Sequence, residues 1–115
     1  MRIIFWGTPQ YAVQSLKELI ISGHQVIAVV TQPDKKRSRG NKLIPSEIKQ
    51  LALNHRIPVL TPDKIKNNDN FISTLKKYKF DVFIVVAYGK ILTKEILEMP
   101  KYGSWNAHAS LLPRW

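Results

Sequence analysis

The chain has 115 residues, 44% of them hydrophobic, and a formal net charge of +10 from 18 Lys and Arg against 8 Asp and Glu. This length and apolar content predict a single globular domain, and the lack of cysteine excludes a disulfide framework, a thiolate metal site and a cysteine nucleophile. No apolar run approaches the roughly 20 residues that span a bilayer, and no signal-peptide cleavage site follows the amino terminus, so we expect a cytoplasmic protein without a membrane partner.

The first thirty residues predict a β-α-β unit. Residues 2–6, RIIFW, are a short run of β-formers that ends at Gly7, which is typical of a buried strand. Thr8 can cap a helix whose apolar residues recur at helical spacing until Gly23. Residues 24–31, HQVIAVVT, predict a second strand that is hydrophobic on both faces, as in a covered parallel sheet.

The middle of the chain predicts a long loop followed by short elements. Residues 32–44 are polar and basic, and loops of this length are disproportionately functional. The pattern then predicts a helix over residues 46–54, a strand at 57–60 and a helix over 70–78.

Residues 80–89, FDVFIVVAYG, form the most apolar segment, so we expect this strand at the centre of the sheet. A helical turn over residues 94–98 leads to a last strand, SWNAHA, at 104–109. Strands alternating with helices predict an α/β fold, an open, mostly parallel, Rossmann-like sheet with helices on both faces.

The turns after the first and the central strand lie where α/β folds bind ligands. A dinucleotide-binding fingerprint needs three glycines, whereas this turn has only Gly7, so a nicotinamide or flavin cofactor is disfavoured. A tight turn explains Gly7 at least as well as a direct contact with a ligand does. After the central strand, Tyr88, Gly89, Ile91 and Leu92 are candidates to line the ligand crevice; a bend with Leu92 in the core is the structural alternative.

Asn106 and His108 form the strongest candidate site. On an extended backbone both side chains point to the same side and can converge on one bound atom. An amide N–H and an imidazole N–H suit an oxygen that gains negative charge in acyl transfer, and the histidine can also move a proton. His24 and His55 lie at helix ends with no second ligand at metal-like spacing, so no metal is expected.

The stretches FWGTPQYA, VVTQPDKKRSRGNKL and VVAYGKILTKEILEMPKYGSWNAHASLLPRW resemble the formyltetrahydrofolate-dependent formyltransferases, and among them the methionyl-tRNA formyltransferase family. The resemblance covers the whole chain and implies transfer of a formyl group from 10-formyltetrahydrofolate, without a metal, to methionine on initiator tRNA. It implies a catalytic pair in Asn106 and His108. The residues that it matches to a tetrahydrofolate-contacting motif are Ser110, Leu111, Leu112 and Pro113. A basic loop that would enter the acceptor stem of the tRNA comprises Lys35, Lys36, Arg37, Arg39 and Lys42.

The chain departs from this family in two respects. Trp6 stands where the family usually has a small residue, so we expect it to crowd the turn at Gly7. The family's downstream catalytic Asp lies beyond Trp115, as do the last strands and a carboxyl-terminal β-barrel domain. We therefore expect residues 1–115 to be the amino-terminal part of a catalytic domain, monomeric, marginally stable and barely active alone, with residues 83–86 lacking strand neighbours.

Two alternatives remain open on the sequence alone. The chain could belong to a formyltransferase for a nucleotide sugar or another small metabolite, although the basic loop would then have no polyanionic substrate to bind. It could instead be a noncatalytic RNA-binding α/β fragment. In either reading, a solvated, mobile loop is the structural alternative for the basic run.

Overall fold

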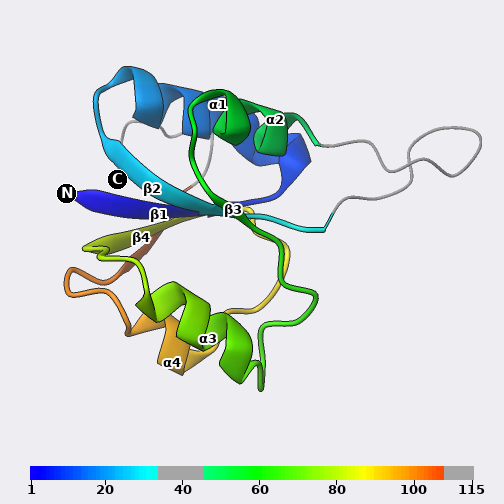
Figure 1. Ribbon diagram of the computed structural model, residues 1–115, viewed down its shortest axis with the longest axis vertical. Helices are drawn as coiled ribbons and strands as arrows, with labels where there is room; N and C mark the ends of the chain where they lie inside the picture. Colours follow the sequence, from blue (N-terminus) through cyan, green and yellow to red (C-terminus); the bar gives the residue numbers. More distant parts are fainter. Residues whose placement is uncertain (34–45, 108–115) are drawn as a thin grey trace, which may run out of the picture.

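A computed structural model describes residues 1–33 and 46–107, which form a parallel sheet between two layers of helices (Figure 1). The helices α1 and α2 cover one face of the sheet, and α3 and α4 cover the other (Figure 1). In chain order the elements are β1 (Arg2–Gly7), α1 (Pro9–Ile21), β2 (Gln25–Val30), α2 (Glu47–Asn54), β3 (Val59–Leu60), α3 (Asp69–Lys76), β4 (Val82–Val86), α4 (Lys94–Leu97) and β5 (Ser104–Asn106). The predicted α/β class and the alternation of strands and helices are therefore confirmed.

The strand order β3-β2-β1-β4-β5 corrects two expectations about the central apolar segment. All pairings are parallel, and the middle position belongs to β1, whereas β4 lies one place to the side. The expectation that residues 83–86 lack neighbours was wrong, because β4 pairs with β1 along one edge and with β5 along the other. Among the described strands, β3 and β5 carry the open edges.

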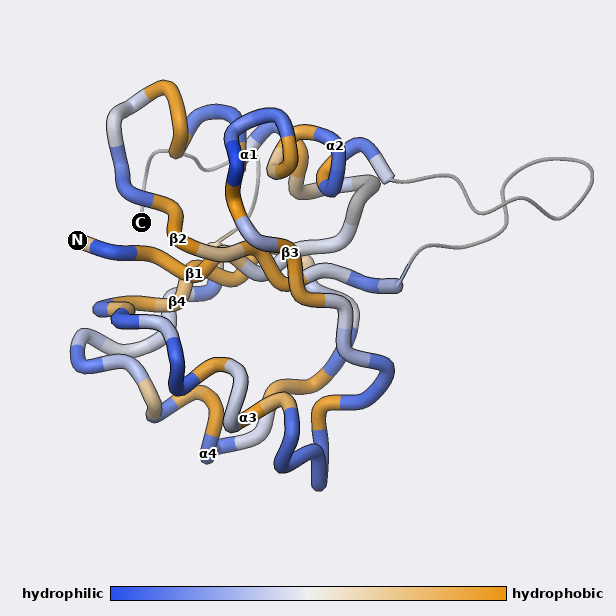
Figure 2. Tube along the Cα trace, in the orientation of Figure 1, coloured by the Kyte–Doolittle hydropathy of each residue, from blue (hydrophilic) through white to orange (hydrophobic). Residues whose placement is uncertain are grey.

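Alternate residues of β1 supply two separate cores, one under each helical layer. Ile3 and Phe5 pack with the apolar residues of α1 and α2, and Ile4 and Trp6 pack with those of α3 and α4. Figure 2 shows apolar residues gathered along the strands and on the sheet-facing sides of the helices. A sheet buried on both faces explains why β1 and β4 read as continuous apolar runs.

The ring of Trp6 does not crowd the turn at Gly7, contrary to the expectation from the sequence. Because Trp6 is fully buried on the α3 and α4 side, its ring lies away from α1. Its neighbours are Phe83, Tyr88 and Phe71, at centroid distances of 5.1, 5.4 and 5.8 Å. The large residue thus fills a core position.

The helix boundaries agree with the predicted ones to within two residues, but one cap differs. Thr8 stands at the N-cap of α1, yet its hydroxyl makes no capping bond and has no partner among the described residues. In contrast, Ser46 accepts a hydrogen bond from the Lys49 amide at 3.2 Å and caps α2 as the pattern predicts. None of the helices within residues 1–33 and 46–107 is long and apolar enough to cross a membrane.

Candidate functional site

The carboxyl ends of β1 and β4 meet where the chain changes direction across the sheet. After β1 the chain enters α1 on one face, and after β4 it leads to α4 on the other (Figure 1). Open α/β sheets bind ligands at such a switch point, because the two diverging connections leave a crevice between them. This places the turn of residues 87–89 beside the start of α1.

Two long-range hydrogen bonds fix the turn after β4. The Thr8 amide donates to the Ala87 carbonyl at 3.2 Å, and the Gln32 side chain donates to the Tyr88 carbonyl at 2.8 Å. Ala87 and Gly89 both have left-handed backbone conformations, with φ of 48° and 86°, so the chain bends here, as the structural alternative for this segment has it. A Cβ at residue 89 would also lie 3.2 Å from Thr8 Cγ2, so both conformation and space favour glycine.

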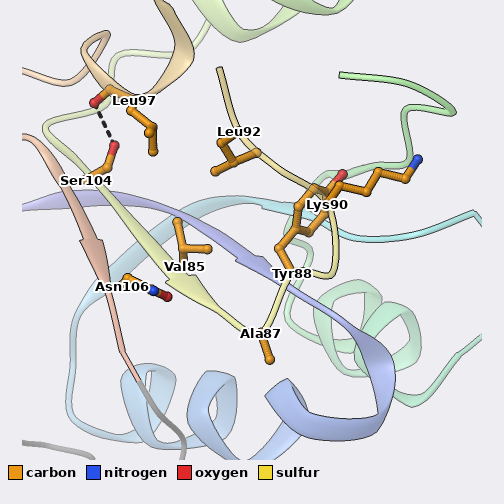
Figure 3. A pocket seen from close by; sticks show the side chains of 8 residues that line it. All are labelled: Val85, Ala87, Tyr88, Lys90, Leu92, Leu97, Ser104 and Asn106. Atoms are coloured by element: carbon orange, nitrogen blue, oxygen red, sulfur yellow. Dashed lines mark hydrogen bonds between the residues drawn. The ribbon is translucent and has the colours of Figure 1, made fainter. Parts of the chain in front are cut away.

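A cavity of about 460 Å³ lies beside this turn, within the range of small-molecule sites (Figure 3). Its walls combine apolar side chains with two polar side chains from β5 and the side chain of Lys90, whose terminal nitrogen points away from the other lining residues (Figure 3). The lining residues are Val85, Ala87, Tyr88, Lys90, Leu92, Leu97, Ser104 and Asn106. The cavity therefore offers a mainly apolar surface with a few placed polar groups, as ligand pockets generally do.

The strand β5 brings its two polar side chains to the cavity. Ser104 and Asn106 are two residues apart on a strand and so share a face, as Figure 3 shows. The Ser104 hydroxyl donates to the Leu97 carbonyl at 2.8 Å, which ties β5 to α4. The Asn106 amide is exposed to solvent at the carboxyl end of β5 and can act as a hydrogen-bond donor at any pH.

The predicted crevice residues separate into two groups. Tyr88 and Leu92 line the cavity, and Asn106 does so from β5. Gly89 lies in the turn itself against Thr8 and Gln32. The side chain of Ile91 is 92% exposed and is not part of the lining. Of the four candidates in this segment, Tyr88 and Leu92 therefore line the cavity, and Gly89 and Ile91 do not.

Several predicted site residues lie outside the described residues. They are His108, Ser110, Leu111, Leu112 and Pro113 after β5, and Lys35, Lys36, Arg37, Arg39 and Lys42 after β2. Their roles stay predictions.

Lys90 and Leu97 line the cavity but were not candidates from the sequence. The Lys90 ammonium donates to the Pro62 carbonyl at 3.4 Å and also to the Asp63 carbonyl, so it joins the turn after β4 to the segment after β3. No local pattern reveals such a contact across 27 or 28 residues. Ser104 could have been predicted from the sequence, because the two-residue period of a strand that places Asn106 and His108 on one face also places Ser104 there.

Among the lining residues, Tyr88 has a pKa that burial shifts clearly. Burial raises the pKa of the Tyr88 phenol to about 12, because the charged form would lose its hydration. Its hydroxyl is buried and has no partner among the described residues, so it stays neutral at physiological pH. Lys90 is the basic residue among the described residues that line the cavity, and its Nζ donates to the Pro62 and Asp63 carbonyls.

The described residues contain no group of three or more His, Cys, Asp or Glu that could hold a metal. Gly7 has a packing explanation, because a Cβ there would lie 2.3 Å from Ala12 Cβ and 3.0 Å from the Val86 carbonyl oxygen. The glycine thus lets α1 approach β1 and β4 closely.

Comparison with known proteins gives the family. The sequence model of the formyl transferase family matches residues 1–115. Proteins named methionyl-tRNA formyltransferase from Prochlorococcus marinus strains MIT 9215 and MIT 9515 are 67% and 65% identical over the whole chain, which corresponds to 35% of each relative. The protein of that name from Sulfurihydrogenibium sp. strain YO3AOP1 is 56% identical, again over the whole chain, and the match covers 37% of it. The chain spans about a third of these relatives, and it belongs to the formyl transferase family.

Proposed function

We propose that residues 1–115 form the amino-terminal part of the catalytic domain of an enzyme that formylates the amino group of methionyl-tRNA with 10-formyltetrahydrofolate, in translation initiation. The observation that carries this proposal is the place of Asn106, which opens the N-A-H sequence and lines a cavity at the switch point of the sheet. The names of the relatives supply the acceptor, and the family supplies the formyl chemistry.

The proposed chemistry needs donors aimed at one oxygen. The neutral amine of methionyl-tRNA attacks the formyl carbon, an N–C bond forms, and the carbonyl oxygen becomes an oxyanion. The Asn106 amide and a protonated His108 donate hydrogen bonds to this oxyanion. The bond from the formyl carbon to N10 of the folate then breaks, and the proton lost by the amine passes to N10 with help from His108 and a downstream Asp.

The volume and mainly apolar lining of the cavity support a folate heterocycle as its ligand. Tyr88 and Leu92 give it apolar walls, and Ala87, in the bend after β4, also lines it. The sequence motif Ser110 to Pro113 is proposed to add further contacts to the tetrahydrofolate.

The basic run from Lys35 to Lys42 is proposed to contact phosphates of the tRNA acceptor stem. Five positive charges within eight residues favour a polyanion, because each phosphate contact releases condensed counterions. A nucleotide-sugar acceptor would leave most of these charges without a partner.

A chimera tests the proposal directly. Residues 1–115 of this chain are followed by the part of the MIT 9215 relative that lies after its matched region, and formylation of methionyl-tRNA by 10-formyltetrahydrofolate is measured. We expect turnover, and we expect Asn106→Ala to lower kcat by about 10²- to 10³-fold with little change in folate affinity, the usual effect of losing one oxyanion donor.

The matched control is Asn70→Ala, at an exposed position on α3 away from the cavity, which should leave kcat unchanged. A folded chimera that formylates an amino-sugar nucleotide but not methionyl-tRNA would establish the small-metabolite alternative. Loss of folate binding with normal kcat at saturation in Asn106→Ala would reassign this residue to the pocket wall.

A further inference from the structure

The turn after β4 is held by all three of the strand connections that precede it. The Thr8 amide, after β1, donates to the Ala87 carbonyl at 3.2 Å. The Gln32 side chain, after β2, donates to the Tyr88 carbonyl at 2.8 Å. The Lys90 ammonium, within the turn, donates to carbonyls of the segment after β3. Of these ties, the one from Gln32 is made by a side chain that reaches the turn from outside it.

The Tyr88 carbonyl lies beyond the end of the strand ladder. β4 pairs with β1 as far as Val86, and then the chain bends. Ala87 and Gly89, on either side of Tyr88, have φ of 48° and 86°, and this left-handed conformation is unfavourable for an alanine. Because Tyr88 is only 2% exposed, a carbonyl here without a donor would be costly. The Gln32 amide thus supplies a hydrogen bond that the ladder does not.

Gln32 extends from a rigid part of the backbone. The preceding residue, Thr31, is fully buried, and its amide donates to the Leu60 carbonyl at 3.0 Å, so the sheet fixes the chain at this point. The Gln32 Nε2 atom lies 3.7 Å from the place that a Cβ on Gly89 would occupy, so the amide group packs along the turn. The donor is therefore preorganised by the sheet.

Tyr88 is fixed at both its side chain and its main chain. Its ring packs edge-on against the Trp6 ring at a centroid distance of 5.4 Å, and its carbonyl accepts the bond from Gln32. Tyr88 lines the cavity together with Ala87 and Leu92, so a movement of this residue would change the shape of the wall. Binding sites are precise when the residues behind their walls lock those walls in place.

We propose that Gln32 is a positioning residue for the folate: through its hydrogen bond to the Tyr88 carbonyl, it holds the wall of residues 87–92 in the shape that receives the heterocycle. Gln32 is not among the lining residues and so acts through Tyr88. This inference rests on the proposed function for the identity of the ligand, but not for the acceptor of the formyl group. A wall that contacts the bound substrate and the transition state equally contributes to KM and not to kcat.

The test uses the chimera described above and measures the binding of 10-formyltetrahydrofolate by isothermal titration calorimetry without an acceptor. Gln32→Met keeps the length of the side chain and removes its N–H donors. We expect the Kd and the KM for the folate to rise about 5- to 20-fold, with kcat within about twofold of wild type, because a buried carbonyl loses its donor. The matched control is Gln14→Met, at an exposed position of α1, which should leave Kd, KM and kcat unchanged.

A second variant separates the hydrogen bond from the packing of the side chain. Gln32→Glu keeps the shape of glutamine, but at pH 8 its carboxylate cannot donate, so it should bind the folate at least as weakly as Gln32→Met. Wild-type affinity in Gln32→Glu would overturn the proposal, because shape alone would then hold the wall. Wild-type affinity in a folded Gln32→Met chimera would overturn it as well. So would a fall in kcat at unchanged Kd, which would place Gln32 at the reacting atoms.

The binding assay distinguishes failure of this inference from failure of the proposed function. A wild-type chimera that binds the folate but formylates no methionyl-tRNA would contradict the proposed acceptor, and the ratio of the Kd values would still decide the role of Gln32. A wild-type chimera that does not bind the folate would overturn both.

Discussion

The protein should lose stability in alkaline solution through one buried phenol, Tyr88. Its side chain is 2% exposed, and its hydroxyl has no partner among the described residues. Burial raises its pKa from 10.0 to about 12. The phenol therefore ionises in the unfolded chain about two pH units before it ionises in the folded protein.

The sign and size of the effect follow from this difference. The folded pKa is above the unfolded one, so the contribution of Tyr88 to stability is fully present below pH 10 and is lost as the pH rises from 10 through 12. Each unit corresponds to about 1.4 kcal/mol, so the free energy of unfolding should fall by about 1.4 kcal/mol at pH 11 and by about 2.7 kcal/mol in total above pH 12. The decisive quantity is the difference between wild type and a variant that lacks this phenol, because every other pH effect is common to both.

Urea unfolding followed by circular dichroism between pH 8 and 11.5 measures this difference. Tyr88→Phe should remove the alkaline loss due to this residue, and at pH 8 it should be neutral or stabilising by up to about 1 kcal/mol, because it deletes a buried hydroxyl without a partner. Tyr11→Phe, at an exposed ring, controls for the loss of one hydroxyl. If wild type and Tyr88→Phe lost stability in parallel from pH 9 to 11.5, the proposed effect of Tyr88 burial would be refuted.

Three further predictions concern the turn, the basic loop and the isolated chain. Gly7→Ala should lower the free energy of unfolding by about 1 to 3 kcal/mol, because the added methyl would lie 2.3 Å from Ala12 Cβ; an unchanged urea midpoint would contradict this. In the chimera, replacing Arg37 and Arg39 by Ala should flatten the log–log salt dependence of tRNA binding by about one unit for each phosphate that is no longer neutralised, with unchanged folate binding. An unaltered slope would leave these charges as solvated loop residues. The 115-residue chain alone should formylate methionyl-tRNA negligibly, since groups that act as a unit lose most of their effect when one is missing; turnover near that of the chimera would refute this.

The sequence predicted the elements well wherever periodicity and caps agreed. The helix after β1 was expected to end before Gly23, and this glycine has a φ of 83° just beyond the C-cap at Ser22. The helix from residue 46 was expected to begin at Ser46, which does cap it. These signals are local, since each depends on residues within one turn of the helix end.

The order of the strands was less accessible, because it depends on where the chain reverses its direction across the sheet. Apolar content placed residues 80–89 at the centre, but β1 and β4 are both buried on two faces and differ little in pattern. The middle position belongs to β1 because the chain returns from β3 across β2 and β1 to form β4. The residue pattern of β4 itself does not indicate that the chain has crossed back over the sheet.

The sequence indicated which segment could line the candidate site, but it did not predict the contacts that hold that segment in place. Tyr88 was placed at the crevice, and it does line the cavity, but its ring also packs against Trp6 in the core. The bond from Lys90 to the Pro62 carbonyl joins segments that are 28 residues apart. Sequence periodicity reports which face a residue occupies, whereas these contacts depend on which loops the topology brings together.

The same reversal of direction that hid the strand order also creates the site. Because the chain runs outward from β1 through β2 to β3 and then returns to β4, the connections after β1 and β4 leave on opposite faces. The two connections diverge above the sheet, and the Thr8 amide holds their first residues together by donating to the Ala87 carbonyl. The space beside that bond is open to a ligand, and β5, which pairs with β4, delivers Asn106 to its margin. A substitution that moves α1 away from β1, such as Gly7→Ala, should therefore disturb the cavity as well as the core, even though Gly7 does not line it.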